Sequence, residues 1–192
     1  FISNSVLRNH LRLPIGDSLT KVELARLIRL SRHVPGPTPA RITFMGYGPL
    51  PLSFLVLAAH PLLVASFDNY DSCGEANERA RRLCCLMRMA FRTSDVACRT
   101  RGLADYDAVF LAALVGMATE ENARVVEHLG RHMAPVATLV VRSAHGACDF
   151  LYPVVDPEEI WRGGFDVLAV HHPECEGINS VFIARKPSSP LR

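Results

Sequence analysis

Short apolar runs recur along the chain from residue 41 onward, and turns or amphipathic stretches separate them. The runs with the length and composition of buried strands are Ile42–Met45, Leu63–Phe67, Met89–Arg92, Ala108–Leu114, Ala137–Arg142, Phe165–His171 and Ser180–Ala184. The helix-like stretches between them are Leu52–His60, Ala76–Cys85, Glu120–His132 and Pro157–Trp161. This alternation predicts a mostly parallel sheet with helices on both of its faces.

The last two predicted strands break the alternation, because only a loop with Pro173 and Gly177 joins them. We therefore expect them to form a closing antiparallel pair. Five parallel strands followed by such a pair resemble the Rossmann-like, S-adenosylmethionine-dependent methyltransferase fold, and this α/β fold is the predicted class.

Length and composition fit one globular domain with a full core: 192 residues, 49% of them hydrophobic, 21% charged, and a net charge of +2. So small a net charge does not indicate a nucleic-acid-binding surface. The apolar runs are too short to span a membrane. The six cysteines form no C-x-x-C pair and are expected to be reduced thiols of a cytoplasmic protein. Composition is compatible with either a monomer or a homo-oligomer.

The predicted domain spans residues 39–187, followed by a tail at 188–192. Residues 1–38 hold a helix-like run, Ser18–Arg32, and end in a proline-rich break. We interpret them as the remnant of an N-terminal helical region. Phe1 stands where a start methionine is usual, so we expect either a fragment of a longer product or a mispredicted gene product.

Gly46 and Gly48 follow the first predicted strand and precede a helix that begins behind Pro49 and Pro51. A strand, a glycine turn and a helix can present backbone N–H groups to a polar or anionic ligand. Pro51 occupies the place of the third glycine of a dinucleotide fingerprint, which argues against a nicotinamide or flavin cofactor.

Polar residues that follow the other strands are the remaining candidates, because ligands bind at the carboxyl ends of such sheets. Asp68 is expected to close strand two and accept both ribose hydroxyls, with Asn69 beside it; the alternative is a solvated turn. Asp95 is expected to accept an adenine amino group, with Val96 beside it; the alternative is a helix cap.

Two further candidates come from strands four and five. The small residues at the end of strand four, with Ala112 and Leu114 as predicted contacts, would let a flat base or the sulfonium chain lie close. Arg142 ends strand five, where an arginine can hold a carboxylate; a surface ion pair is the alternative. A cluster at His171, His172, Glu174 and Cys175 matches no common zinc spacing, so no metal site is predicted.

Five blocks of the sequence strongly resemble plant nicotianamine synthases, over about His33 to Lys186. The blocks are Gly46-Tyr-Gly-Pro-Leu-Pro-Leu-Ser53, Phe67-Asp-Asn-Tyr-Asp71, Tyr106-Asp-Ala-Val-Phe-Leu-Ala-Ala-Leu-Val-Gly-Met117, Val140-Val-Arg-Ser-Ala-His-Gly146 and Ile178-Asn-Ser180. The resemblance implies a transferase that condenses three molecules of S-adenosylmethionine into nicotianamine and releases methylthioadenosine. It also implies a role in metal homeostasis, although the enzyme itself uses no metal.

Within that chemistry, Asp68 and Asp95 would hold the adenosine and the Gly46–Gly48 turn the sulfonium arm. Arg142 or Tyr70 would steer a carboxylate or an amine, and these two are the predicted catalytic residues.

Departures from the family pattern leave two alternatives open. The family's N-terminal helical portion, which supplies a glutamate and a tyrosine, is nearly absent, and its Asn-Tyr pair reads Asn9-His10 here. The family's Gly-Ser-Gly reads Gly46-Tyr47-Gly48, which is expected to place a ring in the ligand turn. The segment between Leu83 and Met89 is also shorter. The alternatives are a truncated paralogue that only binds S-adenosylmethionine and a methyltransferase of another small acceptor.

Overall fold

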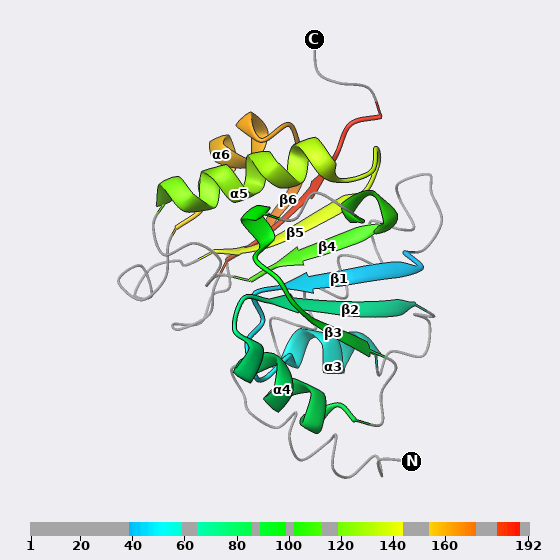
Figure 1. Ribbon diagram of the computed structural model, residues 1–192. Helices are drawn as coiled ribbons and strands as arrows, with labels where there is room; N and C mark the ends of the chain where they lie inside the picture. The colour runs from blue at the N-terminus through cyan, green and yellow to red at the C-terminus, as the bar shows by residue number, and fades with distance from the viewer. Residues whose placement is uncertain are drawn as a thin grey trace.

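The computed structural model describes residues 39–58, 65–85, 89–98, 102–112, 119–143, 154–171 and 180–188. They contain a seven-stranded sheet in the order β3-β2-β1-β4-β5-β7-β6 (Figure 1). The strands are β1 (Arg41–Met45), β2 (Ser66–Asp71), β3 (Met89–Thr93), β4 (Ala108–Leu111), β5 (Thr138–Ser143), β6 (Asp166–His171) and β7 (Ser180–Arg185).

Strands β1 to β5 are mutually parallel, and β7 runs antiparallel to both of its neighbours, β5 and β6. The chain order reverses beside β1, which pairs with β2 on one side and β4 on the other. Such a reversal leaves a crevice at the carboxyl ends of the strands, where ligands of open α/β sheets bind.

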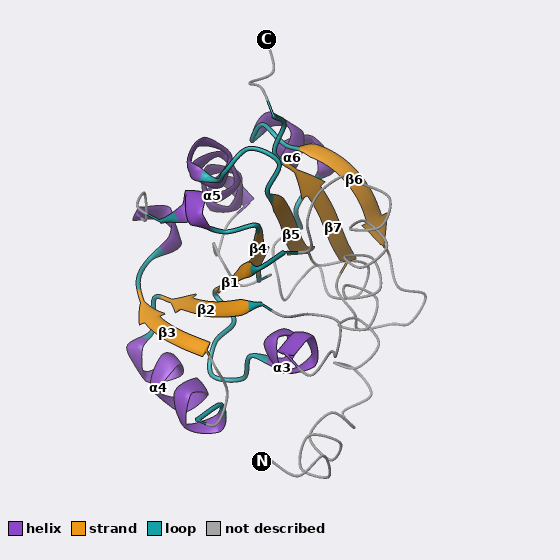
Figure 2. Cartoon of the chain, turned by 90° about the vertical axis from the view of Figure 1, so that its right-hand side faces the viewer, coloured by secondary structure: helices purple, strands orange, loops and turns teal. Residues whose placement is uncertain are grey.

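Helices cover both faces of the sheet (Figure 2). On one face lie α3 (Leu52–Ala58) and α4 (Gly74–Leu83). On the other lie α5 (Thr119–His132), α6 (Pro157–Arg162) and the short 3-10 helices η1 (Val96–Cys98) and η2 (Leu103–Asp105).

Each face has its own apolar core, because neighbouring strand residues point to opposite sides. Between α3 and the sheet, Phe54 of the helix packs against Phe44 and Phe67, and Phe44 also packs against Phe110; the ring centroids of these pairs are 5.0–6.2 Å apart. Beneath α5, the helix contributes Val125, Val126, Leu129 and the adjoining Met133 to the second core. All of these side chains are buried.

The predicted fold class and the parallel sheet with an antiparallel closure are confirmed. One strand was predicted wrongly: β2 covers Ser66–Asp71, not Leu63–Phe67. Its polar residues look like a turn in the sequence, but Asn69 and Asp71 are buried in the strand. The predicted helix at Ser18–Arg32 lies outside the described residues, so the boundary proposed near residue 38 stays a prediction.

None of the described helices combines the length and the apolar character needed to cross a bilayer. In the described ranges, no three His, Cys, Asp or Glu side chains gather in a way that could hold a metal ion.

Candidate functional site

The turn after β1 is tied to the end of β2 by two backbone donors. Gly46 and Gly48 have φ angles of 71° and 64°, which residues other than glycine rarely adopt. The N–H of Gly46 donates to the carbonyl of Tyr70 (2.8 Å), and the N–H of Gly48 donates to Oδ2 of Asp71 (2.9 Å). Among the residues that the structure describes, none beyond its two chain neighbours has an atom within 4 Å of a Cβ built at Gly48.

Asp71 is the last residue of β2, at the carboxyl edge of the sheet. Its side chain is 8% exposed, and its Oδ1 accepts a hydrogen bond from the N–H of Cys73 (2.8 Å), just before α4. With Gly48 on Oδ2, each carboxylate oxygen has one backbone donor and can accept another. Asp71 therefore occupies the position that the sequence prediction gave to Asp68.

The sequence held a usable signal for Asp71. It is the acidic residue that directly precedes Ser72, Cys73 and Gly74, where α4 begins. The prediction missed this because it ended the strand four residues earlier, at Phe67.

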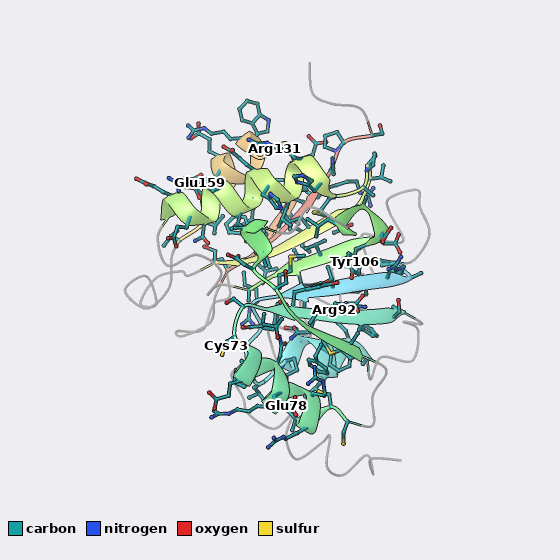
Figure 3. All side chains as sticks on the ribbon, viewed as in Figure 1. Cys73, Glu78, Arg92, Tyr106, Arg131 and Glu159 are labelled. Carbon is teal, nitrogen blue, oxygen red and sulfur yellow. The ribbon has the colours of Figure 1, made fainter. Side chains whose placement is uncertain are left out.

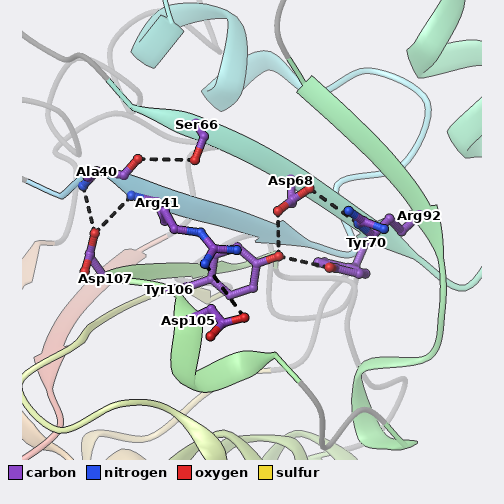
Figure 4. Close-up of polar contacts among 9 residues, drawn as sticks. All are labelled: Ala40, Arg41, Ser66, Asp68, Tyr70, Arg92, Asp105, Tyr106 and Asp107. Carbon is purple, nitrogen blue, oxygen red and sulfur yellow. Dashed lines mark hydrogen bonds and ion pairs between the residues drawn. The ribbon is translucent and has the colours of Figure 1, made fainter.

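Asp68 lies inside β2, opposite Thr43, and it faces the α5 side of the sheet. The hydroxyl of Tyr106 donates to its Oδ2 (2.6 Å), and Arg92 Nε lies 3.5 Å from its Oδ1 (Figure 4). The hydroxyls of Tyr70 and Tyr106 are 2.9 Å apart. Because the hydroxyl of Tyr106 has one hydrogen and donates it in the hydrogen bond to Asp68, the hydroxyl of Tyr70 must be the donor in the bond between the two tyrosines.

We call Asp68, Tyr70, Arg92 and Tyr106 the Tyr106 cluster. The pKa of Tyr106 is raised. The largest cause is burial, which disfavours the charged tyrosinate, and the hydrogen bonds to Asp68 and Tyr70 come next. Tyr70 and Asp68 raise the pKa of Arg92. The guanidinium of Arg41, at the start of β1, lies 5.4 Å from the centre of the Tyr106 ring. The cluster thus extends toward the amino ends of the strands, and the ligand roles of Asp68 and Tyr70 stay predictions.

The ends of β3 and β4 bring two further predicted contacts to the carboxyl edge. Oδ1 of Asp95 accepts from the N–H of Ala97 (2.9 Å), so Asp95 caps η1, as the alternative interpretation proposed. The N–H of Ala112 donates to the carbonyl of Met45 (3.0 Å) and extends the pairing of β4 with β1. Val96 is buried in the core beneath α5, and Leu114 lies outside the described residues.

Asn69 was expected to touch the ligand, but the structure places it under α4. It is fully buried, and its Nδ2 donates to Oδ1 of Asn77 (3.0 Å). Asn77, which the sequence prediction did not include, lies in α4 and is the central polar residue between that helix and the sheet. Its position shows no chemical pattern in the sequence, so only the fold could identify it.

Tyr47 and Arg142 complete the predicted set. The Tyr47 ring meets Phe44 edge to face (centroids 5.2 Å apart, 75° between planes) and packs against the core beneath α3. The expected obstruction of the ligand turn by this ring stays a prediction. Arg142 is half-buried at the next-to-last position of β5, at the same edge of the sheet as the turn. Ser143 ends the strand and accepts from the N–H of Val155 (2.7 Å).

Comparison with known proteins gives one family. The family model described as "Nicotianamine synthase protein" matches residues 16–190. Nicotianamine synthase 9 of Hordeum vulgare is 67% identical over 184 residues, which are 93% of this chain and 54% of the relative. Nicotianamine synthase 3 of Oryza sativa subsp. indica is 68% identical over 174 residues, or 86% of this chain and 51% of the relative. The chain therefore spans about half the length of the curated relatives it matches.

Solved structures agree on the fold. A mutant of MtNAS in complex with S-adenosylmethionine aligns with a TM-score of 0.71 at 23% identity, covering 92% of this chain and 65% of that one. The N-methyltransferase NodS of Bradyrhizobium japonicum aligns with a TM-score of 0.67 at 14% identity, covering 92% and 99%. At these identities the alignments establish the methyltransferase-like fold.

Proposed function

Because the chain belongs to the nicotianamine synthase family, we propose that it binds S-adenosylmethionine and carries out, or forms part of, the synthesis of nicotianamine. The observation that carries this proposal is the glycine turn anchored on Asp71, within a sequence that matches the family along nearly its whole length. The solved MtNAS complex with S-adenosylmethionine, which has the same fold, supports the choice of ligand.

The carboxyl edge of β1 to β5 is the proposed binding site. Asp71 would accept hydrogen bonds from the ribose hydroxyls through the unused capacity of its oxygens. Asp68 is the alternative that the sequence favoured. The Gly46–Gly48 turn would lie against the sulfonium arm, Asp95 near the adenine amino group, and Ala112 and Leu114 near the flat base.

The reaction proposed by family membership moves an aminocarboxypropyl group. The neutral amine of one S-adenosylmethionine attacks the carbon of that arm bonded to the sulfonium of another. An N–C bond forms, the C–S bond breaks, and methylthioadenosine leaves with the electron pair on sulfur. The nitrogen then loses a proton. A second transfer of the same kind joins the third S-adenosylmethionine, and an intramolecular attack on the last carbon bonded to a sulfonium closes the azetidine ring. Three C–S bonds break in all, and three methylthioadenosines leave. Positioning has to decide which carbon next to the sulfonium is attacked, and Arg142 or Tyr70 would hold the carboxylate or amine in place.

The test is to incubate the purified 192-residue chain with S-adenosylmethionine and to identify products by mass spectrometry. Nicotianamine together with methylthioadenosine is expected. S-adenosylhomocysteine would instead indicate a methyltransferase. Binding measured by calorimetry without either product would leave a chain that binds the substrate but does not turn it over.

The biological setting is inferred from the same family membership. We place the chain in the metal homeostasis of a plant, through a product that chelates metal ions, and we expect a cytoplasmic location. Cys73, Cys84 and Cys85 are free thiols, which suits a reducing compartment. Whether copies of the chain associate would be measured by light scattering.

A further inference from the structure

Asn77 joins the ends of two strands from the first turns of α4. Its side chain is buried, with 1% of the residue exposed. Its Nδ2 lies 3.0 Å from the carbonyl oxygen of Arg92, 3.3 Å from that of Asp71 and 3.3 Å from Oγ1 of Thr93. Its Oδ1 accepts from Nδ2 of Asn69, which fixes the orientation of the amide. A buried amide this well bonded holds its partners at set distances.

The partners lie where β2 and β3 part. Asp71 and Thr93 are the last paired residues of these two strands. Just beyond them the N–H of Ser94 donates to the carbonyl of Asp71 (3.0 Å), so that carbonyl accepts from both Ser94 and Asn77. The chain then turns into α4 on one side and toward Asp95 on the other. Asn77 thus adds a side-chain link between the two strand ends to the backbone bond that Ser94 makes.

We infer that Asn77 is a positioning residue for the nucleoside of bound S-adenosylmethionine. The inference rests on the proposed function. Asp71 and Asp95, the proposed partners of ribose and adenine, stand on the two strand ends that Asn77 joins. Asn77 touches neither carboxylate, so it acts through the main chain of Asp71 and of the Arg92–Thr93 end. Loss of its amide lets the two carboxylates move independently, and a ligand that needs both at once binds more weakly.

The test compares Asn77→Ala with Ala80→Gly, a control in the same helix. Ala80 is fully buried one turn further along α4 and has no side-chain polar group. Glycine there lowers stability through helix propensity while leaving the strand ends untouched. Calorimetry with S-adenosylmethionine and with methylthioadenosine, beside thermal unfolding of each variant, separates positioning from loss of stability. We expect Asn77→Ala to raise both dissociation constants about tenfold, as the loss of several hydrogen bonds allows, and Ala80→Gly to change them less than about twofold.

Amide hydrogen exchange followed by NMR tests the same inference without a ligand. The N–H of Ser94 should exchange faster in Asn77→Ala, whereas the N–H of Ala112, at the end of β4, should not change. Equal dissociation constants for Asn77→Ala and Ala80→Gly, or unchanged exchange at Ser94, would overturn the inference.

A milder variant covers the case in which Asn77→Ala does not fold. Thr93→Val removes one acceptor at an exposed strand end, and we expect it to weaken binding about two- to threefold. No change in this variant would also overturn the inference. If the unmodified chain binds neither ligand, the proposed function fails and this inference with it. Selective weakening in Asn77→Ala alone leaves the function in place and supports the role of Asn77.

Discussion

Asp71 and Asp68 are three residues apart in one strand, yet their surroundings give them different roles. Asp71 ends β2 and accepts backbone hydrogen bonds from the glycine turn and from the start of α4. Asp68 lies within β2 and accepts a hydrogen bond from the hydroxyl of Tyr106. An odd number of positions along a strand separates them, so they point to opposite faces of the sheet.

Paired variants of these two aspartates test which one the ligand needs. Asp71→Asn removes the charge and one acceptor, and hydrogen bonds to a charged group contribute about 1.5–3 kcal/mol. We expect it to raise the dissociation constant for S-adenosylmethionine at least about tenfold, as measured by calorimetry. Asp68→Asn should leave that constant within about twofold and lower the free energy of unfolding by about 1 kcal/mol. The reverse result would restore Asp68 as the ribose ligand.

The Tyr106 cluster predicts how stability depends on alkaline pH. Tyrosine in an unfolded chain has a pKa of about 10, and the pKa of Tyr106 is raised in the folded protein. The contribution of its protonated form is therefore complete below pH ~10 and is lost as the pH rises toward the folded value. Over that window the free energy of unfolding should fall by up to about 1.4 kcal/mol per pH unit.

Tyr106→Phe should lower stability by about 1 kcal/mol at neutral pH and make the alkaline decline shallower, as urea unfolding at several pH values would measure. Burial raises the pKa of Cys84 from 9.0 to about 11, so this thiol adds a decline of its own. Because that decline is present in both proteins, the difference between the two curves isolates Tyr106. Parallel curves would show that Tyr106 does not carry the effect.

At the scale of elements, polar residues with buried partners caused the main error of the sequence prediction. The ends of apolar strands such as β4 and β7 were predicted to within about three residues, because a run of apolar side chains indicates a buried strand. In β2 the run Asp68-Asn69-Tyr70-Asp71 looks like a turn. The Nδ2 of Asn69 is nevertheless bonded in the interior, by Oδ1 of Asn77, and Asp68 accepts a hydrogen bond from Tyr106. Partners eight and thirty-eight residues away cannot be inferred from a local pattern.

The contact between α5 and α6 depends on a glycine that the sequence does not single out. A Cβ at Gly130 would lie 1.8 Å from the carbonyl oxygen of Gly163, which follows α6. In Figure 3 the two helices lie side by side, with Arg131 and Glu159 labelled on them. The close approach leaves no space for a methyl group between the backbones.

Gly130→Ala should therefore lower the free energy of unfolding by at least about 2 kcal/mol, although alanine is favoured in helices. Gly74→Ala is the matched control at the start of α4. Its Cβ would make an ordinary contact, 3.6 Å from Oγ1 of Thr93, and should change stability by less than about 1 kcal/mol. Urea unfolding of both variants measures the contrast. Equal effects would mean that the two helices can move apart at little cost.

At the scale of the molecule, the sequence predicted the sheet and which residues lie at its carboxyl edge, but not the detailed positions of the side chains there. Alternation of strands and helices fixes the parallel order, and parallel order brings every loop after a strand to one edge. It does not determine where a strand ends. For that reason Gly46, Gly48, Asp95, Ala112 and Arg142 were predicted at the edge where they lie, whereas Asp68, Asn69 and Tyr70 face inward.

This separation of the two ends of the sheet predicts a pattern of protection by the ligand. Saturating S-adenosylmethionine should slow amide exchange at 46–48, 71–73, 94–97 and 112, which lie at or just after the carboxyl ends of parallel strands. It should have little effect at Arg41 and at Asp105–Asp107, where the N–H groups of Ala40 and Arg41 donate to Oδ2 of Asp107 at the opposite end. A ligand at about 100 times its dissociation constant adds about 2.7 kcal/mol to global stability. This added stability slows exchange by global unfolding throughout the molecule. Binding at the carboxyl edge should slow exchange there by more than this, whereas equal slowing at both ends would mean that the ligand only stabilises the fold as a whole.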